Sequence, residues 1–186
     1  MNWSNSTNRY GSLSIALHWL MFLLIVAVYA CMELREIFPK GSDPRAAMKT
    51  WHFMLGLSVF VLVWLRLGLR LLQPTPTIEP RPVAWQQYLA KVVHWAFYAM
   101  MIAMPIAGWM ILSAEGDAIP FYGLELPALI AKNKDTAEWI EEMHKTAGTA
   151  GYFLIALHTG AALFHHYMLR DNTLTRILPE RTPPKR

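Results

Sequence analysis

Cysteine and charge are both scarce in this 186-residue sequence, and each shortage excludes a class of protein. The one cysteine, Cys31, cannot form a disulfide within the chain or supply a cysteine-ligated zinc site or iron-sulfur cluster. Charged residues make up 16% of the chain and hydrophobic residues 54%, which is too apolar for an ordinary soluble domain of this length. We therefore expect a membrane protein.

The basic residues do not indicate a nucleic-acid partner, although the net charge is +4. They lie beside apolar segments and form neither a continuous run nor a known binding motif. A membrane surface explains their distribution better. We expect contact with membrane lipid and none with nucleic acid. No nucleophile or pair of carboxylates presents itself as a hydrolytic site.

Four apolar stretches of about 20 residues each dominate the sequence. As helices they are long enough to cross a hydrocarbon core of about 30 Å. They lie at residues 13–32, 52–72, 92–113 and 145–168. The predicted fold class is all-α: one integral membrane four-helix bundle over residues 1–186.

The connections between these stretches are polar or rich in proline. The plainest linker is "PTPTIEPRP" at residues 74–82, which we expect to be extended. Within the third connection, "PALIAKNKDTAEWIEEM" at residues 127–143 favours a short helix on the outer surface. The first apolar stretch resembles a signal sequence only superficially because it has no small-x-small cleavage site, so we expect it to stay attached.

Lysine and arginine placement predicts the orientation, since cytoplasmic connections carry the excess of these residues. Of the 17, ten lie in the N-terminal segment, in the second connection with the adjoining Arg66 and Arg70, and in the C-terminal tail. The first and third connections, at residues 33–51 and 114–145, hold the other seven. Both termini are therefore predicted to be cytoplasmic, with those two connections outside.

All seven histidines fall in or at the edge of the apolar stretches. Ionisable residues at membrane depth are costly and usually face the bundle interior with a partner, so this clustering indicates a function. The alternative for any single histidine is an interhelical hydrogen bond or a position among the lipid headgroups. The seven are His18, His52, His94, His144, His158, His165 and His166.

The spacing of His144 and His158 favours a more specific interpretation. Fourteen residues of helix leave the two side chains within about 40° of each other around the axis and about 21 Å apart along it. Two haems at different depths need this arrangement, since each iron takes axial imidazoles from both sides. In an antiparallel bundle His52 shares the outer level with His144, and His18 shares the inner level with His158.

Glycines support this pairing. Gly56 follows His52 by four residues and Gly148 follows His144 by four, so each leaves out a side chain one turn deeper on the ligand face. Gly151 lies midway between His144 and His158. A porphyrin could lie close to the backbone at these positions. The alternative is ordinary helix packing through small residues, which is common in membranes.

With these histidines and glycines, the sequence resembles the bacterial cytochrome b561 family of four-helix dihaem membrane cytochromes. The likeness covers nearly the whole chain and is carried by "SIALHW", "MELREIFPKG", "MHKTAGTAGYFLIALHTGAALFHHY" and "RDNTLTRILP". The resemblance implies two haem b groups in the bacterial cytoplasmic (inner) membrane, crossed several times by the chain. Carried onto matching positions, the iron ligands are His18, His52, His144 and His158.

Within that family the chain is most similar to members that oxidise superoxide to oxygen and pass the electrons to ubiquinone. On the outer side, Arg35, Lys40, Arg45 and Lys49 then form a positive patch that would concentrate a small anion such as superoxide. The alternative is that they are ordinary interfacial charges mixed with acidic neighbours: Glu33, Glu36 and Asp43.

On the inner side, His165 lies seven residues beyond His158, on nearly the same face and about 10 Å further along. It could hydrogen-bond a quinone carbonyl or shuttle its protons. His166 is turned away by about 100° and fits a headgroup or haem-propionate contact equally well. His94, near the inner end of the third stretch, is the alternative candidate for the inner ligand position.

Two other functions stay open from the sequence. A cytochrome b subunit that relays electrons from a dehydrogenase or hydrogenase partner to quinone would need the same histidine spacing, whereas superoxide oxidation needs no protein partner. A histidine-lined transporter for a metal ion or proton would show no haem absorbance, and the sequence has no evident inverted repeats or broken helices.

Overall fold

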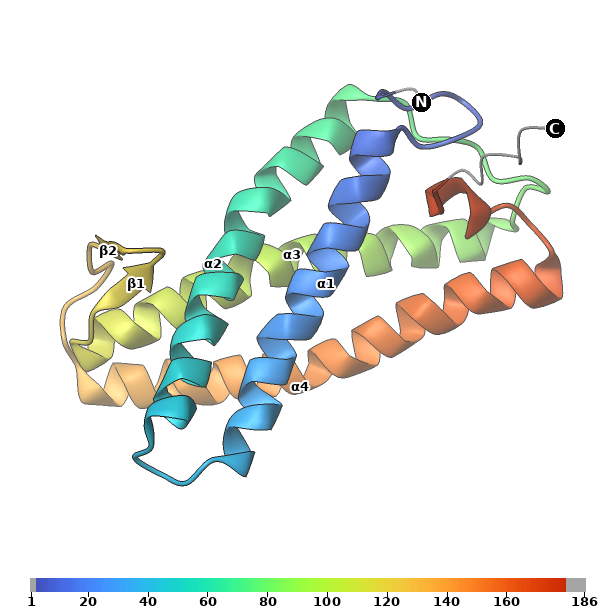
Figure 1. The fold of residues 1–186 in the computed structure, drawn as a ribbon. Coiled ribbons are helices and arrows are strands. Elements are labelled where there is room, and N and C mark those ends of the chain that lie inside the picture. Colours follow the sequence, from blue (N-terminus) through green and yellow to red (C-terminus); the bar gives the residue numbers. More distant parts are fainter. Residues whose placement is uncertain (1–2, 180–186) are drawn as a thin grey trace, which may run out of the picture.

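Four long helices make up most of the chain, as the apolar stretches predict. The computed structural model describes residues 3–179. Its helices are α1 (Ser12–Leu34), α2 (Asp43–Leu72), α3 (Ala84–Glu115) and α4 (Lys134–Phe164). Each belongs to a segment that is long and apolar enough to cross a membrane. The pair α1 and α2 lies across the pair α3 and α4, and the helices within each pair are antiparallel (Figure 1).

Three helices begin well before their apolar stretches, and in α2 and α4 polar residues supply the helix start. Helix α2 begins at Asp43 with proline in its first turn, where a missing backbone N–H costs nothing. Helix α4 begins after Asn133, whose side chain accepts a hydrogen bond from the Thr136 backbone N–H at 2.9 Å. The separate surface helix predicted within residues 127–143 is therefore wrong: residues 134–143 are the first turns of α4 itself.

A small hairpin, absent from the sequence prediction, joins α3 to α4. Strands β1 (Ile119–Phe121) and β2 (Leu124–Leu126) pair antiparallel. Tyr122 and Gly123 turn the chain between them with φ angles of 48° and 87°. Ile119 is buried against Leu57 of α2 and Leu112 of α3, so the hairpin covers the bundle there.

The two ends of the bundle differ in what they contain. The end with the α1–α2 connection, the hairpin and the start of α4 is called here the loop end. The opposite end, where the N-terminal segment, the α2–α3 linker and the C-terminal segment meet, is called the terminal end (Figure 1). The connection at the loop end contains the short 3₁₀ helix η1 (Arg35–Ile37).

Apolar side chains divide between a small core and an outward face. The core comprises Met21, Val59, Val63 and Tyr98, from three helices. Many other large apolar side chains point outward, including Leu23 and Phe153, which are 61% and 73% exposed. A soluble protein rarely exposes so many, whereas lipid contact requires them.

Three segments are tied together at the terminal end. The Thr77 N–H donates to the Thr7 carbonyl at 2.8 Å, and the Asn172 N–H donates to the Glu79 carbonyl at 3.1 Å. The Trp19 indole N–H donates to the Ile177 carbonyl in the 3₁₀ helix η3 (Thr175–Ile177) at 3.0 Å. Of the basic residues that predict the orientation, Arg181, Lys185 and Arg186 lie outside the described residues.

Candidate functional site

Two pairs of histidines face each other between helices. At the loop end, the ring centres of His52 from α2 and His144 from α4 are 6.1 Å apart. Towards the terminal end, those of His18 from α1 and His158 from α4 are 6.4 Å apart. The structure thus brings together the partners that depth and spacing pair in the sequence, with one member of each pair on α4.

His94 lies beside the second pair. Its ring centre is 5.5 Å from that of His158, so His158 has a histidine neighbour on α1 and another on α3. Phe97 also contacts His158, at 5.2 Å between ring centres. The sequence left His94 as the alternative ligand, and the structure places it close enough to keep that alternative open.

Hydrogen bonds to Nδ1 differ among the histidines. His52 Nδ1 lies 3.0 Å from the Val28 carbonyl and His94 Nδ1 lies 2.6 Å from the Ala90 carbonyl. A carbonyl can only accept, so these two rings carry their proton on Nδ1 and keep the Nε2 lone pair free for a metal. His144 Nδ1 is buried without a hydrogen-bond partner. His18 Nδ1 instead lies 3.1 Å from an Arg66 guanidinium nitrogen, which can only donate.

An apolar cavity of about 140 Å³ opens beside the His52 and His144 rings. All four helices contribute to its lining, and most of the lining side chains are aliphatic, aromatic or methionine. Gly56, Gly148 and Gly151 line it as well, which agrees with the expectation that these glycines lie on the ligand face.

The three glycines leave different amounts of space. A Cβ atom added to Gly56 would meet nothing within 4 Å, and one added to Gly148 would meet only the Met104 methyl carbon at 3.8 Å. One added to Gly151 would lie 2.1 Å from the Tyr29 hydroxyl oxygen. That hydroxyl donates to the Gly148 carbonyl at 2.8 Å. Gly151 therefore makes room for Tyr29, whereas Gly56 and Gly148 leave cavity.

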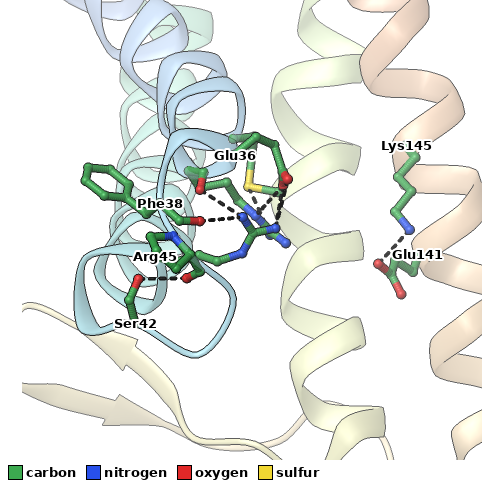
Figure 2. Close-up of polar contacts among 9 residues, drawn as sticks. Glu36, Phe38, Ser42, Arg45, Glu141 and Lys145 are labelled. Carbon is green, nitrogen blue, oxygen red and sulfur yellow. Dashed lines mark hydrogen bonds and ion pairs between the residues drawn. The ribbon is translucent and has the colours of Figure 1, made fainter.

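Carboxylates engage the basic residues at the loop end. Arg45 donates to both Glu36 carboxylate oxygens, at 2.7 and 2.9 Å, and also to the Arg35 and Phe38 carbonyls (Figure 2). Arg35 contacts the same carboxylate at 3.2 Å. Glu36 thus holds two of the four cations that the sequence assigns to a positive patch.

The remaining cations are more accessible. Lys49, one turn from His52, lies 3.6 Å from Glu115 and keeps 44% of its side chain exposed. Lys40 is exposed in the α1–α2 connection. Lys145 directly follows His144 and pairs with Glu141 at 2.8 Å (Figure 2). The sequence interpretation missed Lys145, although its position next to a candidate ligand was a usable signal.

A carboxylate that the sequence interpretation also missed contacts His165 at the terminal end. His165 Nδ1 lies 2.5 Å from Asp171 Oδ2, and the Thr173 N–H donates to Asp171 Oδ1 at 2.8 Å. Burial acts to raise the pKa of Asp171, but the hydrogen bonds from His165 and the Thr173 backbone outweigh it and hold that pKa below its usual range. His166 contacts Tyr167 instead.

We expect acid to loosen this end of the chain. Because the folded-state pKa of Asp171 is lowered, its ionised form stabilises the fold above the unfolded value of about 3.9. That contribution is lost as the pH falls through the folded value. Amide hydrogen exchange over residues 171–178 should therefore accelerate below about pH 4 relative to the core. In an Asp171→Asn chain the acceleration should be absent; persistence of the full effect would contradict the assignment.

Comparison with known proteins identifies the family. The family model of prokaryotic cytochrome b561 matches residues 9–180. The chain belongs to the prokaryotic cytochrome b561 family. It is 39% identical over 174 residues to cytochrome b561 homolog 1 of Escherichia coli K12, covering 94% of this chain and 99% of that protein. To the probable superoxide oxidase CybB of Yersinia pestis it is 39% identical over 173 residues, covering 93% and 97% respectively. Cytochrome b562 of Cereibacter sphaeroides is 26% identical over 176 residues, with 92% and 96% covered.

Membership makes this cytochrome b561 protein a bacterial membrane electron-transfer protein and implies b-type haem. The histidine pairs fit such a group. A metal–imidazole bond of about 2 Å and about 1 Å from nitrogen to ring centre put two imidazoles on opposite sides of one iron about 6 Å apart. The separations of 6.1 and 6.4 Å agree with this value. The open space at Gly56 fits a bound porphyrin as well.

Proposed function

We propose that this chain is a superoxide:ubiquinone oxidoreductase of the bacterial inner membrane, with two b haems between its helices. It oxidises superoxide to oxygen at the outer face and passes the electrons through the haems to ubiquinone at the inner face. The supporting comparison is the 39% identity to a protein named as a probable superoxide oxidase. The supporting geometry is the presence of two histidine pairs along α4.

The proposed ligands are His52 with His144 at the loop end and His18 with His158 towards the terminal end. For the second group, the ring centres of His18 and His94 lie 6.4 and 5.5 Å from that of His158, so the separation does not distinguish them. The Nδ1 partner favours His94, since Arg66 would have to release His18 Nδ1 before its Nε2 could bind iron. We assign His18 because helix depth and the family resemblance both select this position. Arg66 would then pair with another acceptor.

The orientation follows the distribution of lysine and arginine. We place the terminal end in the cytoplasm and the loop end outside, because the N-terminal segment, the second connection with Arg66 and Arg70, and the C-terminal tail together hold ten of the 17 basic residues of the sequence. The first histidine pair then lies near the outer surface and the second near the inner one. The His165 side chain, about two helical turns beyond His158, then lies on the quinone side.

The residues of the chain supply ligation and access at each end. Bound b haem would supply one-electron redox chemistry. His52 and His144 would hold it beside the apolar cavity. Arg35, Lys40 and Lys49 would raise the local concentration of the superoxide anion at the loop end. Two superoxide ions give two oxygen molecules, and the two electrons with two protons convert ubiquinone to ubiquinol.

The experiment is superoxide-driven quinone reduction by the purified chain in detergent. Superoxide is generated enzymatically and quinol formation from ubiquinone-1 is followed by absorbance, with the His144→Ala chain as control. We expect quinol formation that depends on His144. Absence of quinol formation would contradict the proposal. Copurification with stoichiometric iron-sulfur subunits would favour the alternative, a cytochrome b subunit that relays electrons from a dehydrogenase or hydrogenase.

Neutralising basic residues at the loop end should slow the reaction of superoxide. We expect the double variant Arg35→Gln/Lys49→Gln to reduce the rate of haem reduction by roughly three- to ten-fold at low salt and to flatten its salt dependence. The double variant Arg81→Gln/Lys91→Gln removes the same charge at the terminal end and should behave like wild type. Stopped-flow absorbance measures both. Equal rates in wild type and both double variants would show that Arg35 and Lys49 do not attract superoxide to the loop end.

A further inference from the structure

A buried carboxylate and an imidazole form a pair where the last helix ends. Asp171 is 6% exposed and follows the π-helix η2 (His165–Leu169) by two residues. Its side chain contacts His165 Nδ1, and its backbone N–H donates to the His165 carbonyl at 3.2 Å. Arg170 adopts a left-handed conformation with φ of 55°, which turns the chain back towards the helix. The local backbone therefore brings this aspartate onto this histidine.

Residues that follow Asp171 in the chain are held in place by contacts with other elements. The α2–α3 linker pairs with the next residue, since the Glu79 N–H donates to Asn172 Oδ1 at 2.9 Å and the Asn172 N–H donates to the Glu79 carbonyl. The buried Arg176 donates to the Pro76 carbonyl and lies over the Tyr10 ring. The charged groups that face Asp171 are thus His165 and, at longer range, Arg176.

This contact determines which nitrogen of His165 is free. A carboxylate accepts, so Nδ1 of His165 carries the proton that it donates to Asp171, and Nε2 is the nitrogen left to act on another molecule. By helical periodicity His165 lies on nearly the same face as His158 and about 10 Å further along. A carboxylate behind an imidazole also fixes the orientation of the ring, as in the serine protease triad.

We propose that Asp171 is a positioning residue that holds His165 as the proton carrier for quinone reduction. This inference rests on the proposed function, since it takes a quinone as the electron acceptor. In each proton transfer the His165 Nε2–H bond breaks as a quinone O–H bond forms, while Nδ1–H stays with the Asp171 carboxylate. His165 Nε2 then takes a new proton from water at the terminal end. Two such transfers and two electrons convert the quinone to the quinol.

The test separates this step from the superoxide reaction. The haems of the purified holoprotein are reduced with dithionite, and their reoxidation by ubiquinone-1 is followed by stopped-flow absorbance between pH 5 and 9. We expect Asp171→Asn to slow reoxidation about ten-fold above neutral pH, below the 10² to 10⁴ typical of losing a whole general acid. The pH profile of reoxidation should also differ from that of wild type, because the His165 ring is no longer held by the carboxylate. Glu79→Gln removes the same charge nearby and should keep the wild-type profile.

Each outcome has a defined meaning. A wild-type pH profile in Asp171→Asn overturns the inference and leaves the proposed function intact. Failure of superoxide to reduce the chain overturns the proposed donor without changing this experiment, because dithionite supplies the electrons. If wild type itself is not reoxidised by ubiquinone-1, the proposed acceptor and this inference both fall. If Asp171→Asn loses its haems, His165→Gln decides: slow reoxidation with little pH dependence supports the inference, and the wild-type profile overturns it.

Discussion

Replacing His144 by alanine is expected to remove one of the two proposed b haems and leave the other in place. The alanine side chain cannot bind iron, and the remaining imidazole of His52 alone holds the group weakly. His158→Ala should remove the other haem in the same way, because the two pairs share no residue. Haem per chain, counted by the pyridine haemochrome method, should fall from two to one in each variant and to none in the double variant.

The control for these variants is a histidine in η2, directly after α4 and outside both pairs. His166 contacts Tyr167 rather than a paired histidine, so His166→Ala should keep both haems. The His18→Ala and His94→Ala chains resolve the second pair: we expect loss of a haem in the first and retention of both in the second. Retention of two haems in His144→Ala would contradict the proposed ligation. Loss of one in His94→Ala would transfer the ligand role from His18 to His94.

Filling the cavity at Gly56 should also exclude a haem, although no ligand is changed. Gly56 lines the cavity beside His52, and a side chain added there would point into open space. Gly56→Leu therefore should fold and insert normally, yet reduce haem at the His52 and His144 site by at least half, because the isobutyl group occupies volume that the porphyrin needs. Haem count and the optical spectrum of the purified chain measure this.

The matched control for Gly56→Leu is on the same helix. Gly68 also has open space at its Cβ position, but it does not line the cavity. Gly68→Leu adds the same side chain to α2 and should keep two haems per chain. Equal haem content in the two variants would show that the cavity at Gly56 does not receive a haem.

Hydropathy and helical periodicity were sufficient to predict four membrane helices and the histidines that meet. Apolar stretches of membrane length allow little other than helices. Antiparallel order then sets the depth of each residue, which is why His52 faces His144 and His18 lies beside His158. These features depend on spacing along single helices, and spacing can be read directly from a sequence.

Features that depend on side-chain competition could not be read in the same way. The turn at Tyr122 and Gly123 lies between two very short strands, too short to give an alternating pattern. The Glu36 carboxylate could have paired with several neighbouring cations, and only the fold shows that Arg45 takes both of its oxygens. His165 meets Asp171 because a left-handed residue turns the chain back, which no periodicity indicates.

The most direct test of the account is the number of b-type haems in the purified wild-type chain. The protein is extracted in detergent, isolated without partner subunits, and assayed for haem and for protein by amino-acid analysis. The two histidine pairs predict two haems per chain, each with the electron paramagnetic resonance signal of a low-spin iron held by two imidazoles. A colourless chain, or one with a single haem, would contradict the account.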